Sequence, residues 1–301
     1  MNKIAFTIYR IFVPKSLRTS ILKKNLRRKI LDYYSSLPAE KVNEEQRKVI
    51  RYLEKNPVTI FPYSFSDNYS PEKIEVQFDP SNSMPYVMQD GRKLFFRKRW
   101  TIFNKKRTVK RIQRACADLA GDQDPESPHC YLSGEFNIET NDVVADIGAA
   151  EGNFSLSVIE KARKIYLVEY DSEWIRALNA TFAPWKDKVE IIGKYVADFD
   201  DDKHITLDTL ISTRNDITFL KIDVDGNEQK VLDGASELLA GKSSLKMALC
   251  TYHKNNDERD FTSLLEKNGF RVIPSGGYMI HYYDKKIACP WLRRGLIRAE
   301  R

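Results

Sequence analysis

Short apolar runs alternate with helix-like patterns along the second half of the chain. Five apolar runs have the length of buried strands, and the segments between them repeat apolar residues every three or four positions. Two further strands, joined by a Gly276-Gly277 turn, close the series. The predicted strands are 143–147, 164–168, 189–193, 217–222, 246–251, 271–273 and 278–283, and the predicted helices are 153–163, 172–181, 226–240 and 257–268. This order predicts an α/β fold with a mostly parallel sheet and right-handed crossovers.

The first apolar run leads through Asp146 into a turn in which Gly148 and Gly152 are four residues apart. A diphosphate cradle needs the spacing G-x-G-x-x-G and disfavours an acid such as Glu151 beside it. Glu169 ends the second run, 23 residues after Asp146, where a carboxylate can accept hydrogen bonds from both ribose hydroxyls. A nucleoside that carries ammonium and sulfonium charges in place of phosphates fits this pattern, as S-adenosylmethionine does. The alternative is a strand-to-helix turn that binds nothing.

The predicted cofactor-binding residues lie in this turn, in the helix start after it, and at the ends of the next strands. They are Asp146, Gly148, Ala149, Glu151, Gly152, Asn153, Phe154, Glu169, Tyr170 and Asp198. Ligands of such sheets bind outside the carboxyl ends of the strands. Asp146, Glu169, Asp223 and His253 are all predicted to lie at that edge, so we expect one site there.

Residues 219–235 read Phe-Leu-Lys-Ile-Asp-Val-Asp-Gly-Asn-Glu-Gln-Lys-Val-Leu-Asp-Gly-Ala. This segment resembles the signature of FkbM-type S-adenosylmethionine-dependent methyltransferases, K-I-D-V-E-G-x-E followed by V-L-x-G-A, and residues 205–211 are also similar to the family. The resemblance covers about residues 123–284. It implies a Rossmann-like seven-stranded methyltransferase sheet and usually O-methyl transfer, with sugars, glycolipids and polyketide-type products as typical acceptors. Asp225 replaces the family's commoner Glu, and Thr251-Tyr252-His253 stands where many members carry a Glu.

A polar loop with two prolines runs from Gly121 to Tyr131, just before the first strand. In Rossmann-like methyltransferases the segment that enters this strand commonly closes over the cofactor. Gln123, Asp124 and His129 are therefore candidate cofactor contacts, and Gln123 and His129 join the predicted binding set. An ordinary connecting loop is the alternative.

Methyl transfer to a hydroxyl needs a base that removes a proton near the transition state. His253 is the first candidate because histidine titrates near neutral pH; Asp223 is the second and Asp225 the third. These three side chains offer an alternative in which magnesium or manganese lowers the pKa of the acceptor, although we assign no metal ligand. Lys221 is expected to pair with one of the two acids. His204 and His281 are expected to be structural or exposed.

The charge of the chain is divided unevenly. Residues 1–37 carry nine Lys and Arg against one acid, and residues 91–114 carry eleven and no acid. Residues 115–290 carry 19 basic and 31 acidic residues, so the predicted catalytic core is acidic. Four cysteines without C-x-x-C spacing indicate neither a zinc site nor a disulfide framework, which fits a reducing, cytoplasmic location.

The N-terminal residues resemble neither a signal peptide nor a membrane span. An apolar stripe, with basic residues on its flanks, predicts an amphipathic helix within residues 1–37: Leu22, Leu26, Ile30, Tyr33 and Leu37. This helix could bind an anionic membrane surface reversibly, or its stripe could pack on the rest of the protein.

Further along, the sequence predicts a helix over 39–56, a loop over 61–85, a hairpin over 85–96 with an Asp90-Gly91 turn, and a helix over 108–120. Phe95, Phe96, Trp100 and Phe103 alternate with basic residues and could stack on single-stranded nucleic acid. They could equally pack inward, and the charges could attract an anionic acceptor or lipid. We favour the last two and do not expect nucleic acid as a partner.

These observations predict an N-terminal helical and hairpin extension (1–122), an S-adenosylmethionine-binding methyltransferase domain (123–290) and a basic tail (291–301). The predicted activity is O-methylation of a hydroxyl on a sugar, glycan or related metabolite. The alternatives are a non-catalytic S-adenosylmethionine-binding module in a membrane-associated glycan-assembly complex and, as a third, a nucleic-acid methyltransferase.

Overall fold

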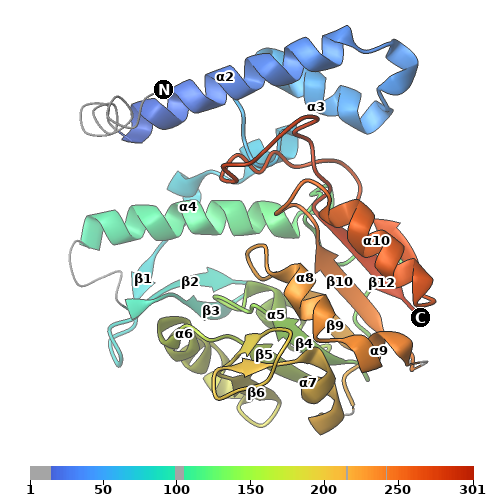
Figure 1. Ribbon diagram of the computed structural model, residues 1–301. Coiled ribbons are helices and arrows are strands. Elements are labelled where there is room, and N and C mark those ends of the chain that lie inside the picture. The colour runs from blue at the N-terminus through green and yellow to red at the C-terminus, as the bar shows by residue number, and fades with distance from the viewer. Residues whose placement is uncertain (1–14, 99–104, 215, 242) are drawn as a thin grey trace, which may run out of the picture.

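A seven-stranded sheet forms the centre of the protein (Figure 1). The computed structural model describes residues 15–98, 105–214, 216–241 and 243–301. The strands lie in the order β11-β12-β10-β9-β4-β5-β6. Their bounds are β4 Val143–Ile147, β5 Lys164–Val168, β6 Val189–Ile192, β9 Phe219–Ile222, β10 Lys246–Cys250, β11 Arg271–Pro274 and β12 Leu296–Glu300. β4, β5, β6, β9 and β10 pair in parallel and β12 is antiparallel to both its neighbours, so the predicted fold class is confirmed.

Hydrophobic cores lie on both faces of this sheet, because successive strand residues point to opposite sides. Val144 belongs to one core, and its neighbours Val143 and Ala145 belong to the other. Strands buried on both faces read as continuous apolar runs, and for this reason they were visible in the sequence. The connecting elements are α5 Asn153–Val158, α6 Ser172–Phe182, η5 Ala183–Trp185, β7 Tyr195–Val196, β8 His204–Ile205, α7 Leu207–Thr213, α8 Glu228–Asp233, α9 Ser236–Ala240 and α10 Asp257–Lys267.

Two predicted helices are shorter than expected. The helix predicted over 153–163 ends at Val158. The helix predicted over 226–240 is two helices, α8 and α9, separated at Gly234. A side chain at position 234 would place its Cβ 2.2 Å from the carbonyl oxygen of Ala197, so the chain comes too close to another loop there for any residue but glycine.

The second closing strand is not the predicted one. Within residues 278–283, only Met279 makes a strand-like bridge, to Arg293. The strand that lies between β10 and β11 is β12, and Ile297 and Ala299 in it are fully buried. The prediction of a strand over 278–283 is therefore wrong, and so is that of a tail over 291–301, which contains an interior strand. β12 was not predicted because it contains charged residues, which are unusual in an interior strand. The charge of Arg298 is accommodated because its guanidinium donates to the carbonyl oxygens of Cys130 and Tyr131.

The N-terminal part consists of helices and a small antiparallel sheet. Its helices are α2 Lys15–Ser36, η1 Ala39–Lys41, α3 Glu44–Lys55, η2 Ser64–Asn68, η3 Pro71–Lys73 and α4 Lys105–Gln123. The sheet contains β1 Gln77–Phe78, β2 Pro85–Gln89 and β3 Arg92–Phe95. The predicted hairpin is confirmed: Asp90 and Gly91 form its turn, both with positive φ. The domain boundary at residue 122 stays a prediction.

The hairpin and α4 pack into one of the two cores of the main sheet. Phe95 and Phe96 are buried there with residues of α5 and α6, so these two aromatic rings pack inward and offer no stacking surface for nucleic acid. Trp100 and Phe103 lie outside the described residues. The backbone N–H of Phe95 donates to Thr181 on α6, which joins the hairpin to the sheet layer.

Helices α2 and α3 form a separate layer beyond α4 (Figure 1). Leu26 and Ile30 of the predicted stripe are buried against Val49 and Leu53 of α3. Arg27, one of the flanking basic residues, donates to the carbonyl oxygens at the C-terminal end of α3. Most of the stripe therefore packs on the protein. Among the described residues, none of the helices is long and apolar enough to span a bilayer.

Ile297 provides a test of β12 as an interior strand. Ile297→Ala is expected to lower the free energy of unfolding by about 2–5 kcal/mol, because it leaves a cavity in a fully buried position. Ile273→Ala on the neighbouring β11 is the matched control, since Ile273 is 44% exposed, and it should cost less than about 1 kcal/mol. Urea denaturation of both variants measures the difference; equal effects would contradict the interior position of β12.

Candidate active site

The turn after β4 is shaped by its contact with the end of β9. Gly148 has a φ of +76°, and a Cβ there would lie 2.0 Å from the carbonyl oxygen of Asp223. Position 148 therefore needs glycine both for its backbone angle and for space. The N–H groups of Gly148 and Ala149 donate to the carbonyl oxygen of Val168, which fixes the turn against the end of β5.

A cavity of about 630 Å³ opens at this edge of the sheet. Five predicted site residues line it: Gly148, Glu169, Tyr170, Asp223 and Asp225; Ala150, from the same turn, lines it as well. Several other lining residues were not predicted as site residues, among them Trp174, Lys194, Tyr195 and Tyr252. The convergence of strand ends on one site, predicted from the strand order, agrees with this geometry.

Glu169 joins the two loops that border the cavity. One of its carboxylate oxygens accepts from the N–H of Ala150 at 3.0 Å, and the other accepts from the N–H of Asp171 at 2.8 Å. Each carboxylate oxygen can accept a second hydrogen bond, so capacity for a ligand remains. Beside it, the ring of Tyr170 stacks on Tyr195 with 4.0 Å between centroids, and Tyr195 is 51% exposed. The cavity thus has a carboxylate next to an aromatic wall.

Asp146 is not directed at a ligand. It is fully buried, lies 2.9 Å from the ammonium of Lys221, and accepts a hydrogen bond from Ser155 at 2.7 Å. Lys221 also donates to the carbonyl oxygen of Gly148. Burial alone would lower the pKa of Lys221, but the carboxylates of Asp146 and Asp223 raise it. Lys221 was expected to pair with Asp223 or Asp225, but the carboxylate that it contacts is that of Asp146, and this pair positions the glycine turn.

Other predicted cofactor residues lie away from the 630 Å³ cavity. Phe154 packs in the core against Tyr131, and Gly152 caps α5 against Leu178 and Phe182. Ala149 and Glu151 are buried without lining the cavity, and Asp198 is exposed next to lining residue Ala197. Gln123 and Asn153 line a different cavity, of about 590 Å³. The roles predicted for these residues stay predictions.

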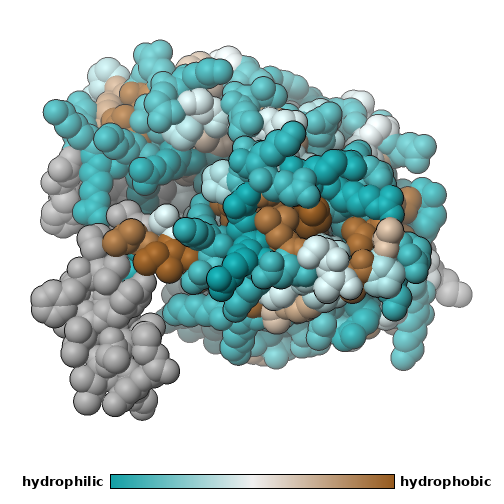
Figure 2. Space-filling view, turned by 90° about the horizontal axis from the view of Figure 1, so that it is seen from above, coloured by the Kyte–Doolittle hydropathy of each residue, from teal (hydrophilic) through white to brown (hydrophobic). Residues whose placement is uncertain are grey.

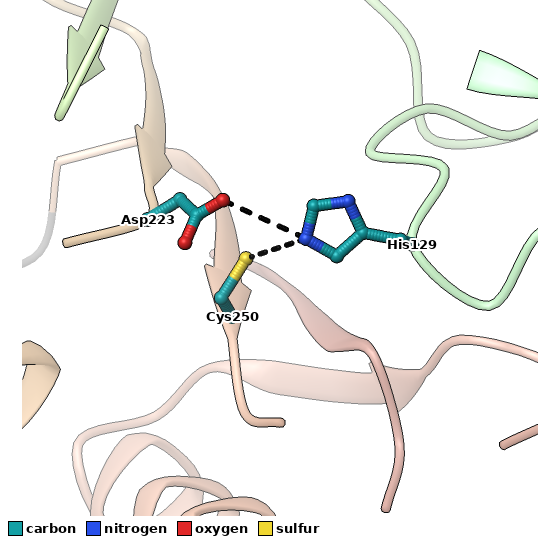
Figure 3. A group of neighbouring side chains, drawn as sticks. All are labelled: His129, Asp223 and Cys250. Carbon is teal, nitrogen blue, oxygen red and sulfur yellow. Dashed lines mark hydrogen bonds and ion pairs between the residues drawn. The ribbon is translucent and has the colours of Figure 1, made fainter. Parts of the chain in front are cut away.

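Asp223 lies where several polar side chains meet. The hydroxyl of Tyr131 donates to it at 2.9 Å and that of Tyr252 at 3.3 Å. His129, from the loop before β4, points its Nε2 at both Asp223, 3.6 Å away, and Cys250, 3.4 Å away (Figure 3). Burial acts to raise the pKa of Asp223, but Lys221 and the two histidines around it lower it to about 2. Asp223 is therefore an ionised carboxylate with His129 beside it, and the predicted contact of His129 with the cofactor stays a prediction.

The alternative of a metal bound by Asp223, Asp225 and His253 gains no support from this arrangement. Nε2 of His253 is 3.8 Å from Asp223 and 3.9 Å from Asp225, but the side chain of Asp225 is fully solvent-exposed. Lys221 is paired with Asp146, and its ammonium and the two histidines nearby lower the pKa of Asp223. We assign no metal ion to these residues.

His253 follows the end of β10 and is almost completely buried. Its Nδ1 lies 2.9 Å from Oε1 of Glu228, although the two groups are not aligned as in an ideal hydrogen bond. Its backbone is held by Arg293, whose guanidinium donates to the carbonyl oxygens of Tyr252 and His253. Burial acts to lower the pKa of His253, but Glu228, Asp223 and Asp225 raise it above its ordinary value.

Sequence reasoning missed several residues of this cluster. Glu228 matches the final Glu of K-I-D-V-E-G-x-E in the FkbM-like motif and could have been found there; Tyr131 and Tyr252 carry no pattern that separates them from core residues. His281, expected to be structural or exposed, lies with its ring centroid 5.5 Å from that of His253. Burial, together with the positive charges of His253 and Arg293, lowers the pKa of His281 to about 4.

Comparison with known proteins bears on the identity of this domain. The family model of the methyltransferase FkbM domain matches residues 147–272, which contain the glycine turn, Glu169, Asp223 and His253. Residues 147–272 form a methyltransferase FkbM domain. The resemblance stated from the 219–235 motif is therefore confirmed. A comparison with curated proteins gave no match.

Solved structures similar to this chain include other methyltransferases. Methyltransferase FkbM from Methylobacillus flagellatus KT is 16% identical with a TM-score of 0.43, over 65% of this chain and 54% of that protein. M. jannaschii TYW2, in complex with AdoMet, is 15% identical with a TM-score of 0.40, over 71% and 84% of the two chains. An rRNA methylase from Streptococcus thermophilus is 12% identical with a TM-score of 0.37, over 55% and 89%. The chain thus spans about half the length of the FkbM structure, and the fold assignment rests on the strand order.

Gly148 offers a test of the close contact within the FkbM domain. Gly148 and Gly91 share a φ of +76°, but a Cβ at Gly91 would meet nothing within 4 Å. Alanine at either position should cost roughly 1–2 kcal/mol for the backbone angle. Gly148→Ala should cost about 1–3 kcal/mol more, because the end of β9 must move. Thermal and urea unfolding of both variants measure the difference, and equal destabilisation would contradict the contact with Asp223.

Proposed function

We propose that this protein transfers the methyl group of S-adenosylmethionine to a hydroxyl group of a small molecule, sugar or glycan. The 630 Å³ cavity at the carboxyl ends of the strands carries the proposal, because one region of its lining suits a nucleoside and another holds an ionised acid. Its volume lies within the range of small-molecule sites, roughly 300–1,000 Å³. A methyltransferase FkbM domain supplies the reaction class, and S-adenosylmethionine agrees with it as the methyl donor.

The donor side of the cavity suits an adenosine without phosphates. The spare hydrogen-bonding capacity of Glu169 fits the two ribose hydroxyls, and the partly exposed aromatic ring of Tyr195 at the cavity wall suits contact with an adenine ring. Gly148 and Ala150 of the turn line the cavity beside Glu169. These contacts predict tighter binding of S-adenosylmethionine than of a dinucleotide.

The acceptor side centres on Asp223 and His253. The acceptor oxygen must lie in line with the sulfur–methyl bond, and its proton must leave as the new bond forms. His253 is the proposed base: its Nε2 takes the proton of the acceptor hydroxyl while the O–CH₃ bond forms and the S–CH₃ bond breaks. The products are the methyl ether, the thioether of the donor and a protonated imidazole. Asp223 remains ionised and stabilises that imidazolium from 3.8 Å.

The other predicted partners stay predictions. Among the described residues, the start of α2 favours a membrane surface, because Leu17, Ile21 and Leu22 are exposed there beside basic residues. Residues 1–14 of the predicted membrane-binding segment lie outside the described part of the chain. Seen from above, where α2 and α3 lie, the surface is mostly hydrophilic with hydrophobic groups scattered over it (Figure 2). The sugar or glycan acceptor, the cytoplasmic location and the alternative of a non-catalytic binding module belong to the same group of untested predictions.

Calorimetric titration with S-adenosylmethionine and S-adenosylhomocysteine, with NAD for comparison, tests the donor. The first two should bind and NAD should not. Glu169→Ala should weaken binding about 10- to 100-fold, because hydrogen bonds to a charged group contribute roughly 1.5–3 kcal/mol. Glu190→Ala is the control, since Glu190 lies on β6 and pairs with Arg214 outside the cavity. A preference for NAD, or no binding of either nucleoside, would exclude the proposed donor.

His253→Ala tests the base. Turnover should fall about 10²–10⁴-fold with donor binding unchanged, measured as transfer of radiolabelled methyl from S-adenosylmethionine to a panel of free sugars, sugar nucleotides and phenols. Unchanged turnover would remove His253 from catalysis, and no methylated product in wild type with any of these would favour the binding module.

The pH profile provides a separate check on His253. Glu228, Asp223 and Asp225 face the ring and raise its pKa, while Arg293, His281 and Asp257, the first residue of α10, also lie around it. A base must be neutral to act, so activity is lost as pH falls through the raised pKa. We expect half-maximal kcat/KM at a pH above about 6.5, the ordinary histidine value. Half-maximal kcat/KM at a pH below 6.5 would contradict the effect of the Glu228, Asp223 and Asp225 carboxylates on the pKa of His253.

A further inference from the structure

We propose that Glu228 is a positioning residue that sets which nitrogen of His253 carries the proton. Its carboxylate holds the proton on Nδ1 and so leaves the lone pair of Nε2 facing Asp223. The role of this contact in catalysis rests on the proposed function of His253 as the base. Its structural content, the tautomer of one histidine, does not.

Glu228 is the first residue of α8 and is completely buried. A buried carboxylate is costly unless a positive or hydrogen-bonding group accompanies it. Nδ1 of His253, 2.9 Å from Oε1, is the ring nitrogen closest to it, and Oε2 has no hydrogen-bond partner among the described residues. The negative charge of Glu228 therefore acts mainly on the imidazole.

The backbone around Glu228 prevents the carboxylate from swinging away. Oε1 also accepts from the N–H of Val224 at 3.1 Å and from that of Gly226 at 3.3 Å. The loop folds over the carboxylate because Asp225 and Gly226 both have positive φ, +52° and +89°. The loop after β9 thus places the same oxygen against two backbone donors and the ring.

His253 is fixed from its other side as well. Arg293 holds its carbonyl oxygen at 2.6 Å, and the ring of Tyr252 lies 4.0 Å from its ring. Nε2 is left near Asp223 and Asp225 at 3.8 and 3.9 Å, which is longer than a direct hydrogen bond. That spacing leaves Nε2 available to a hydroxyl that approaches between the two carboxylates.

A neutral imidazole has one N–H donor and one lone pair, and the group beside one nitrogen decides the role of the other. A carboxylate at Nδ1 favours a donor there, so Nε2 becomes the acceptor that a general base needs. The imperfect alignment of Nδ1 with Glu228 is compatible with this role, since catalytic hydrogen bonds often tighten only when substrate binds.

Nitrogen-15 NMR of histidine-labelled protein tests the proposal without any acceptor. The chain has four histidines, and His253→Ala identifies the signal of interest. Spectra are recorded well above the raised pKa, where His253 is neutral. In wild type we expect Nδ1 to carry the proton and Nε2 to show the shift of a lone pair. A wild-type ring protonated on Nε2 would overturn the proposal, whatever the variants do.

Glu228→Gln removes the charge but keeps an oxygen for the N–H groups of Val224 and Gly226, so the loop can remain. The Nδ1-protonated fraction of His253 should fall measurably, whereas Glu258→Gln on α10 should leave it unchanged. Glu228→Asp, which retains the charge, serves if the Gln variant does not fold. An unchanged tautomer in a folded Gln variant would contradict the inference.

Kinetics then separates positioning from mere structural support. Glu228→Gln should lower kcat about 10-fold or more while the dissociation constant for S-adenosylhomocysteine stays within about twofold, with Glu228→Asp restoring part of kcat. If His253→Ala retains full turnover but the tautomer responds to Glu228, the proposed base is wrong and the positioning contact is right. The two failures are therefore distinguishable.

Discussion

The buried pair of Lys221 and Asp146 is the interaction on which the site depends. A lysine within a strand buried on both faces is costly unless its charge is compensated, and here one carboxylate lies 2.9 Å away and a carbonyl oxygen completes the contact. The two residues sit on adjacent strands, so the pair joins the ends of β4 and β9. Because the carbonyl belongs to Gly148, the same ammonium holds the glycine turn over the end of β9. Gly148 lies directly against the backbone of Asp223, with no space between them, and this contact places Asp223 at the cavity.

From this centre the site extends through loops that arrive from distant parts of the chain. Glu169 connects the turn after β4 with the loop after β5, and His129 and Tyr131 bring in the loop before β4. Arg293, just before β12, fixes the loop after β10. The loops at these strand ends carry the polar side chains, and hydrogen bonds hold the loops to one another. The rigid sheet therefore fixes the positions of the polar groups. The positions of Asp223 and His253 follow from this construction.

The sequence predicted the features that depend on local pattern and strand order. Strands β4, β5 and β9 are continuous apolar runs, and parallel strands must end at a common edge, so Glu169, Asp223 and His253 could be placed there. Glu228 and His281 were missed because their approach to His253 depends on how loops fold back, which no periodicity encodes. β12 was missed because its arginine and glutamate resemble a polar tail, and only the carbonyl oxygens of a distant loop satisfy Arg298. The contact of Asp146 with Lys221 was not predicted, because the two residues lie 75 positions apart in sequence.

Three of the four histidines, His129, His253 and His281, lie around Asp223. The surroundings of His253 and His281 shift their pKa values in opposite directions. His253 faces carboxylates, which raise its pKa, whereas His281 is buried beside a positively charged ring and a guanidinium, which lower its pKa to about 4. When the environments of two neighbouring titratable groups shift their pKa values in opposite directions, the two groups can take different roles in proton transfer. Near neutral pH, His281 is uncharged and does not compete for the proton that His253 takes up. An imidazole that gains charge beside Asp223 is stabilised, while one that stays neutral 5.5 Å away adds no repulsion. The cluster can therefore hold one additional proton, and its carboxylates direct that proton to His253.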